Sequence, residues 1–211
     1  MKTVLCYGDS NTYGYEPLSG TRYPKEQRWT TILQNKLGAE YEVVPEGLNG
    51  RTTAYDRPDY VWKNGFPYLA PCLATNKPLD YVIFMLGTND CNADLHLSEN
   101  DIARGMERLI EEVENVIPDM QDYLPKMILI APAAIRDGWE SSPFAEQLNE
   151  DSIRKSHAIA PLYKAIAEKH GCLFLDVSET LEVSPYDCEH LTVNSHAKLA
   201  ELLAEMILAA N

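Results

Sequence analysis

The sequence predicts an α/β fold, a three-layer α/β/α sandwich in which a central parallel sheet of about five strands is covered by helices on both faces. Short apolar runs alternate with amphipathic helical patterns along most of the chain, which is typical of parallel sheets with right-handed crossovers. The run over residues 81–86 is apolar throughout, as expected for a central strand buried on both faces. A length of 211 residues suits one domain, so we expect a single domain over residues 1–211.

The expected elements follow in order along the chain. The strands are predicted at Thr3 to Tyr7, Tyr41 to Val44, Tyr81 to Leu86, Met127 to Ala131 and Leu173 to Val177. The helices are predicted at Trp29 to Leu37, Ser98 to Val116, about Glu146 to Lys169, and Ser195 to Ala209 after an Asn194 cap. In the second helix apolar residues recur every three or four positions, which indicates one buried face.

Two segments fit this alternation poorly and are expected to be long loops. Residues 53–73 and 132–144 are rich in aromatic side chains. Such loops beside a sheet edge often shape a pocket or contact another subunit. The alternative interpretation is that their aromatic rings pack onto the domain itself.

The charge of the chain excludes two classes of partner. It carries 18 Lys and Arg against 32 Asp and Glu, a formal net charge of −14. Such a surface repels nucleic acid and anionic lipid headgroups, so we expect neither nucleic acid nor a membrane as a partner. No stretch approaches the roughly 20 apolar residues that span a bilayer.

The cysteines and the N-terminus indicate a cytoplasmic protein. The five cysteines are odd in number and form no Cys-x-x-Cys pair, which favours reduced thiols over disulfides or a zinc site. The first expected strand begins directly after Met1 and Lys2, which leaves no room for a signal peptide. Cys188 stands between a candidate acid and a candidate base, and the favoured interpretation is a loop thiol without a catalytic role.

Polar residues follow the ends of the expected strands. Ser10 follows the first strand, Gly50 the second and Asn89 the third, while Asp187 and His190 follow the fifth. Loops that leave the carboxyl ends of parallel strands gather at one edge of the sheet, so we expect these five residues to meet there.

Ser10, His190 and Asp187 have the chemistry of a nucleophile, its base and an orienting acid. A serine hydroxyl needs a neighbouring base at neutral pH. His190 could take its proton, and Asp187 could hold the imidazole in the correct tautomer. The alternative is that Asp187 caps a turn and His190 is a surface residue. His196 is the nearest rival base, although a packing role is favoured for it.

Four blocks carry a resemblance to a known family. They are Thr3 to Asn11 with its Gly-Asp-Ser, Gly47 to Thr53, Met85 to Asp90, and Asp187 to Thr192. Together they resemble the GDSL, or SGNH, hydrolases, whose Ser, Gly, Asn and His match Ser10, Gly50, Asn89 and His190. The resemblance implies a flavodoxin-like sheet and an oxyanion hole made by the backbone N–H groups of Ser10 and Gly50 and the side-chain amide of Asn89.

The second and third blocks are similar to those of the arylesterase and acyltransferase branch of that family. This resemblance implies a serine esterase that hydrolyses small short-chain esters, with acyl transfer to alcohols in some members, and a homo-oligomer. The sequence departs from the family pattern directly after the nucleophile, where it has Asn11 instead of the commoner Leu.

No cofactor and no metal is expected, because the chain has neither a nucleotide-binding loop nor metal-ligand spacing.

Two other functions stay open at this point. The first is deacetylation of an acetylated carbohydrate, because the same fold hosts such esterases. The second is a non-catalytic module that binds a small ligand. The presence of all four motif residues argues against the second.

Overall fold

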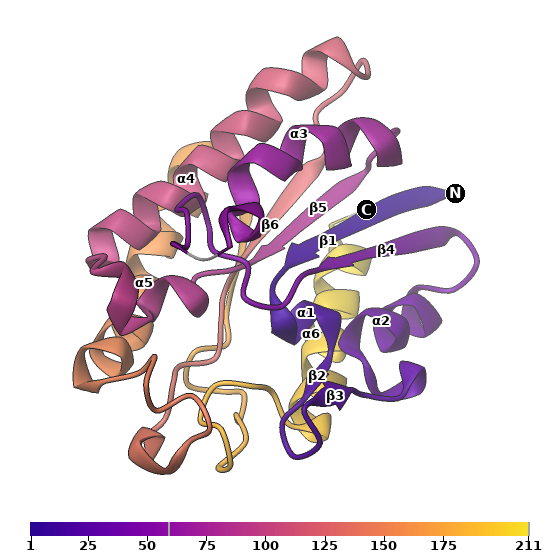
Figure 1. Ribbon diagram of the computed structural model, residues 1–211. Coiled ribbons are helices and arrows are strands. Elements are labelled where there is room, and N and C mark those ends of the chain that lie inside the picture. The colour runs from indigo at the N-terminus through magenta and orange to yellow at the C-terminus, as the bar shows by residue number, and fades with distance from the viewer. Residues whose placement is uncertain (59, 211) are drawn as a thin grey trace.

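Five parallel strands form the central sheet of the computed structural model, which describes residues 1–58 and 60–210 (Figure 1). Their order is β4-β1-β5-β6-β7. The strands are β1 (Lys2–Gly8), β4 (Tyr41–Gly47), β5 (Tyr81–Met85), β6 (Lys126–Ala131) and β7 (Leu173–Asp176). The predicted parallel sheet is confirmed, with each strand within a few residues of its expected position.

Helices cover both faces of this sheet, so the predicted three-layer sandwich is confirmed. One face packs against α3 (Gly65–Asn76), α4 (Glu99–Val116) and α5 (Glu150–His170), and the other against α2 (Trp29–Leu37) and α6 (Val193–Ala209). Alternate side chains of β1 serve the two cores: Leu5 and Tyr7 face the first, Val4 and Cys6 the second. All four are fully buried, as expected for a strand in the middle of a covered sheet.

The capping residues explain where the helices begin. Asn149 caps α5 by accepting a hydrogen bond from Ser152 N at 2.8 Å, so this helix begins later than its apolar pattern suggests. The predicted cap of α6 was wrong. Thr192, not Asn194, accepts from Ser195 N at 3.2 Å, and the helix begins two residues before the predicted start.

The prediction of a loop over residues 53–73 was also wrong in part, because α3 begins at Gly65. Asn64 caps this helix through a hydrogen bond from Phe66 N. Pro67 lies in the first turn, where no intrahelical hydrogen-bond donor is required, while Pro71 lies inside the helix and interrupts the pattern that would predict it. The helix supplies the crossover between β4 and β5.

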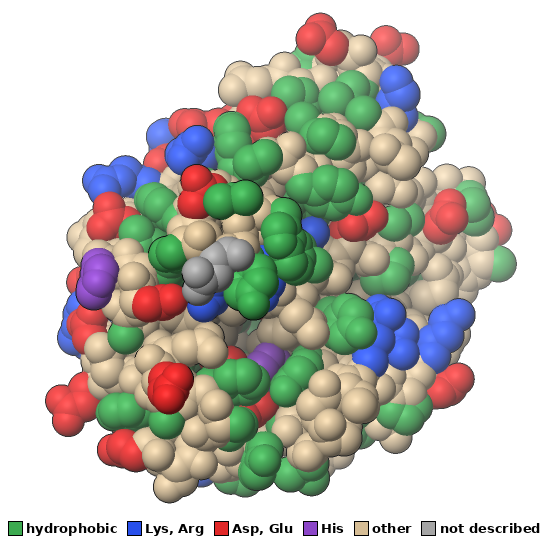
Figure 2. All heavy atoms as spheres, viewed as in Figure 1, with side chains coloured by type: hydrophobic (Ala, Val, Ile, Leu, Met, Phe, Trp, Pro, Cys, Tyr) green, Lys and Arg blue, Asp and Glu red, His purple; other side chains and the backbone are tan. Residues whose placement is uncertain are grey.

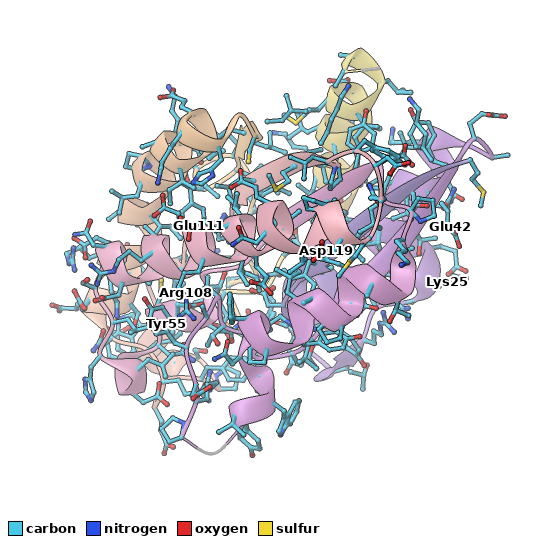
Figure 3. All side chains as sticks on the ribbon, turned by 90° about the horizontal axis from the view of Figure 1, so that it is seen from above. Lys25, Glu42, Tyr55, Arg108, Glu111 and Asp119 are labelled. Carbon is cyan, nitrogen blue, oxygen red and sulfur yellow. The ribbon has the colours of Figure 1, made fainter. Side chains whose placement is uncertain are left out.

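Short elements complete the chain. They are α1 (Ser10–Tyr13), the antiparallel pair β2 (Tyr15–Glu16) and β3 (Thr21–Arg22), and the turns η1 (Lys25–Gln27), η2 (Val61–Lys63), η3 (Asn89–Cys91), η4 (Ala93–Leu95), η5 (Ile117–Asp119) and η6 (Trp139–Ser141). Part of the 53–73 segment packs onto α4, where the hydroxyl of Tyr55 donates to Asp101 O and Arg108 lies over the Phe66 ring (Figure 3). Among the described residues, no helix has the length and apolar character needed to cross a membrane.

Candidate active site

Three side chains from opposite ends of the chain are hydrogen-bonded in a line at the carboxyl edge of the sheet. The Ser10 hydroxyl donates to His190 Nε2 at 2.8 Å, and His190 Nδ1 donates to Asp187 Oδ2 at 2.8 Å. The structure thus brings together all three residues of the predicted nucleophile, base and acid. This edge is hollowed, and hydrophobic side chains surround the hollow (Figure 2).

A tight turn at the end of β1 fixes the position of Ser10. A Cβ built on Gly8 would lie 2.1 Å from Thr12 Oγ1, so only glycine allows the chain to bend this closely onto α1. Asp9 then caps α1, with its Oδ1 accepting from Asn11 N at 2.9 Å. Ser10 is the first residue of the helix, where backbone N–H groups have no intrahelical acceptor. Its N–H is thereby free to serve a substrate.

The surroundings of His190 favour its charged form relative to free imidazole. Burial lowers the pKa of His190, but the hydrogen bond to Asp187 and the charges of Glu189, Asp187 and Asp9 outweigh it, so the pKa is raised. Glu189 Oε1 lies 3.9 Å from His190 Nδ1. Burial raises the pKa of Glu189 to about 7. The imidazolium that forms during proton transfer is therefore stabilised by Asp187 and, at pH values where Glu189 is ionised, by a second carboxylate.

Asn11 holds the loop that carries His190, a role that the sequence analysis did not assign. Its Nδ2 donates to Glu189 O at 3.3 Å, and its Oδ1 accepts from Leu191 N at 2.8 Å. The two bonds fasten the backbone on either side of the base. The departure from leucine noted after Ser10 was the only signal of this role in the sequence.

The other two predicted oxyanion donors, Gly50 and Asn89, lie in loops that are hydrogen-bonded to residues next to Ser10. Gly50 adopts a φ of +78°, a left-handed conformation that favours glycine. Asn89, at the start of η3, donates from Nδ2 to Arg51 O at 3.1 Å, and Nδ2 lies 3.4 Å from Asp9 Oδ2. These contacts tie the Asn89 amide both to the residue after Gly50 and to the residue before Ser10.

Arg51 and Asp90 join the loops that follow three strands. Arg51 binds two backbone carbonyls and lies over an aromatic ring. Its Nη1 donates to Gly8 O at 2.9 Å and to the Glu46 carbonyl, and its guanidinium lies 4.2 Å from the centre of the Tyr7 ring. Asp90 accepts from the backbone and hydroxyl of Thr53, at 3.0 and 2.5 Å. The loops after β1, β4 and β5 therefore form one hydrogen-bonded unit.

Aromatic rings flank the base. The centre of the Tyr15 ring lies 4.3 Å from that of His190, and the Phe144 ring lies 5.7 Å away. Phe144 belongs to the aromatic segment over residues 132–144, for which a pocket role was one of the two interpretations. No sequence pattern predicted that Tyr15 would lie beside the base. Both rings offer an apolar surface to a small ester.

His196 and Cys188 lie close in sequence to the site but are packed into the protein. His196 is fully buried, accepts from Trp29 N at 3.4 Å, and packs edge-on against Tyr23. Burial lowers its pKa to about 3, so its ring is neutral. Cys188 is buried, and burial raises its pKa, which disfavours the reactive thiolate.

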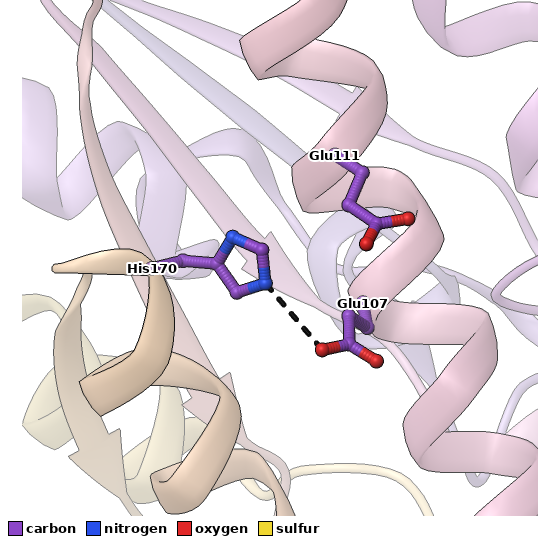
Figure 4. A group of neighbouring side chains, drawn as sticks. All are labelled: Glu107, Glu111 and His170. Carbon is purple, nitrogen blue, oxygen red and sulfur yellow. Dashed lines mark hydrogen bonds and ion pairs between the residues drawn. The ribbon is translucent and has the colours of Figure 1, made fainter.

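One group of His and acidic side chains in the described ranges lies close enough to share a cation. It consists of Glu107, Glu111 and His170, whose candidate ligand atoms lie within 4.8 Å of one another (Figure 4). Lys169 Nζ already pairs with Glu107 at 2.7 Å, and His170 Nδ1 lies 3.0 Å from Glu114 Oε1. We assign this group as an ion-pair network between α4 and the end of α5, remote from Ser10.

Similarity to known proteins extends over nearly the whole chain. The model of the GDSL-like lipase/acylhydrolase family matches residues 6–203. The chain is similar to a carbohydrate acetylesterase from Sinorhizobium meliloti (34% identity, TM-score 0.91, 100% of each chain covered). It is also similar to the aryl esterase of M. smegmatis (34%, 0.91, 99% of each). A carbohydrate acetylesterase family member from S. meliloti is similar as well (35%, 0.92, 98% of this chain and 97% of that one). No curated protein matches the sequence.

Proposed function

The chain belongs to the GDSL-like lipase/acylhydrolase family, and on this basis we propose that it is a serine esterase that hydrolyses small short-chain carboxylic esters through Ser10, His190 and Asp187. The observation that carries the proposal is the continuous pair of 2.8 Å hydrogen bonds from Ser10 through His190 to Asp187. Similarity to an aryl esterase and to carbohydrate acetylesterases supports the choice of ester substrates.

In the first half of the proposed reaction, Ser10 Oγ attacks the ester carbonyl while His190 Nε2 takes the hydroxyl proton. Asp187 holds the imidazole through Nδ1 and stabilises its positive charge. The negative charge that develops on the carbonyl oxygen is met by the N–H groups of Ser10 and Gly50 and by the Asn89 amide. His190 then gives its proton to the leaving alcohol, and the acyl group stays on Ser10 as an ester.

In the second half, water attacks the acyl-enzyme. His190 takes a proton from the water and returns it to Ser10 Oγ as the acid leaves. An alcohol can take the place of water and then leaves as a new ester, so acyl transfer is a further activity of the same site. The rings of Tyr15 and Phe144 favour an apolar alcohol beside the imidazole.

The experiment that tests the function measures hydrolysis of aryl esters of graded acyl length, from acetate upward, together with labelling by a fluorophosphonate. We expect labelling on Ser10 and the highest rates for acetyl and propionyl esters. Acetylated xylo-oligosaccharides distinguish the second candidate, a carbohydrate acetyl esterase, which the two Sinorhizobium meliloti relatives favour. A binding module would neither label nor hydrolyse any of these esters.

Substitution of Asn89 by alanine is expected to lower kcat by about 10²–10³ with little change in KM, because one donor to the developing charge is lost. The measurement is steady-state hydrolysis of an aryl acetate. Asn76→Ala is the matched control, because Asn76 ends α3 and its amide donates to Cys72 O away from the site. Near-normal kcat in Asn89→Ala would show that Asn89 only braces the loop through Arg51 O.

We further propose that the protein works in the cytoplasm as a single-domain homo-oligomer, without nucleic acid or membrane partners. The free state of all five cysteines supports a reducing compartment.

Four large side chains around η2 and α3 are exposed to solvent, and we call them the 60–68 patch: Tyr60, Val61, Trp62 and Tyr68. An adjoining groove of about 490 Å³ includes Leu48, Pro67 and Pro71 in its lining. A second copy of the chain would cover this apolar surface.

Light scattering at micromolar concentration is therefore expected to give a mass above that of the 23.8 kDa monomer. Trp62→Glu should shift the protein toward the monomer, because it places a charge in the centre of the covered surface. Tyr123→Glu is the control, since Tyr123 is 48% exposed but lies outside the patch. A monomeric wild-type protein would contradict the assignment.

A further inference from the structure

Lys63 places an ammonium group beside the backbone of Gly50. A Cβ built on Gly50 would lie 2.8 Å from Lys63 Nζ, so the ammonium occupies the space beside the backbone of a proposed oxyanion donor. Lys63 ends the η2 turn, and this turn is fastened to the segment after Gly50, because Thr52 N donates to Lys63 O at 3.0 Å. The position of the ammonium is therefore built into the same unit that positions the site.

This ammonium has no carboxylate partner among residues 1–58 and 60–210. Its neighbours there are aromatic faces, with Nζ 4.3 Å from the centre of the Tyr60 ring and 5.5 Å from that of Trp62. Burial lowers the pKa of Lys63, and the positive charge of Arg57 lowers it further. A half-buried cation that no carboxylate of the described residues neutralises is costly, and the chain as a whole has a net charge of −14. An anion from outside the chain would offset that cost.

Arg57 adds positive charge near both Lys63 and Glu189. Its charge lowers the pKa of Lys63 and also that of Glu189, so its guanidinium lies within electrostatic range of both. Its contacts in the described structure are loose: Nη2 lies 3.6 Å from Asp94 Oδ2 and 3.4 Å from Gln147 Oε1. A guanidinium has five N–H donors. Arg57 can therefore add its charge and a donor to a ligand without leaving these partners.

We propose that Lys63, assisted by Arg57, forms an anion subsite at the mouth of the active site, and that the preferred esters carry a carboxylate or similar negatively charged oxygen group. A lysine ammonium acts as a point charge and recognises the charge of the group more than its shape. An anion held beside Gly50 would also orient the ester carbonyl toward Ser10. This inference rests on the proposed esterase function and names the substrate class of the same site.

The test compares matched pairs of aryl acetates, 3- and 4-acetoxybenzoate against the corresponding neutral acetoxybenzamides. Each substrate is measured with wild-type protein, Lys63→Met, Lys63→Arg and the surface control Lys164→Met, so intrinsic reactivity cancels within each substrate. Lys63→Met is expected to lower kcat/KM for at least one acetoxybenzoate about five- to twentyfold, mainly by raising KM. This is the size of effect expected when one partly screened ion pair is lost. The benzamides should change less than about twofold, and Lys63→Arg should retain most of the preference.

Salt provides a second measurement that needs no variant. The wild-type preference for the carboxylates should fall as the ionic strength rises, because the Debye length shrinks to about 3 Å at 1 M salt. An equal loss for charged and neutral esters in Lys63→Met would overturn the proposal and place Lys63 in oxyanion stabilisation or loop support. Unchanged rates for all substrates would also overturn it. If no ester is hydrolysed and no fluorophosphonate labels Ser10, the proposed function itself has failed.

Discussion

Replacement of Ser10 by alanine is expected to abolish ester hydrolysis, with kcat lowered by about 10⁴–10⁶. The oxygen that attacks the carbonyl is lost, while the cap from Asp9 to Asn11 N and the His190–Asp187 pair stay in place. Hydrolysis of an aryl acetate and labelling by a fluorophosphonate are the two measurements. Both should be lost together in this variant.

The control for this substitution is Ser178→Ala, which removes another largely buried hydroxyl, bonded to Asp176 Oδ1 at 2.6 Å. It should retain activity and labelling. Thermal unfolding of Ser10→Ala should stay close to that of the wild type, because the loss concerns chemistry rather than packing. Substantial hydrolysis by a folded Ser10→Ala protein would contradict the whole proposed mechanism.

The sheet and most of the helices could be predicted because their signals are local. The unbroken apolar run of β5 and the three- and four-residue spacing in α4 each reflect burial on particular faces. Strand ends then place Ser10, Asn89 and His190 at one edge, since all five strands run in the same direction. The convergence of the triad follows from this topology together with the order of the motifs.

The features that could not be predicted depend on contacts between distant segments. Helix α3 was missed because its prolines break the helical pattern, although the Asn64 cap and the packing of its apolar residues on the core stabilise it. Arg51 binds backbone carbonyls after β1 and β4, which no local pattern reveals. Tyr15 reaches His190 only through the fold. The ammonium of Lys63 likewise meets Gly50 through a turn far along the chain.

His190→Ala is expected to lower kcat about as much as Ser10→Ala, because residues that act as one unit lose function together. His196→Ala is the matched control. It removes a buried ring that packs on Tyr23, so the free energy of unfolding should fall by about 1–3 kcal/mol, as for other truncations of core side chains. Its kcat should change only a few-fold. Steady-state kinetics and denaturant unfolding of both variants separate the two effects. The reverse ranking in kcat would transfer the role of base to His196.

The pH profile of the wild type tests the same assignment without a substitution at the base. The reaction needs neutral His190, whose pKa is raised above the free value of about 6.5. We therefore expect kcat/KM to be at its maximum at higher pH and to fall as the pH drops through that raised pKa. Glu189→Gln removes a carboxyl 3.9 Å from Nδ1 that is only partly ionised on this limb, because its pKa is raised to about 7, so the limb should move to lower pH by a small amount. Glu179→Gln, on the exposed carboxylate that pairs with His157, should leave the limb unmoved. A limb that stays in place in Glu189→Gln would show that Asp187 and Asp9 raise the pKa of the base without Glu189.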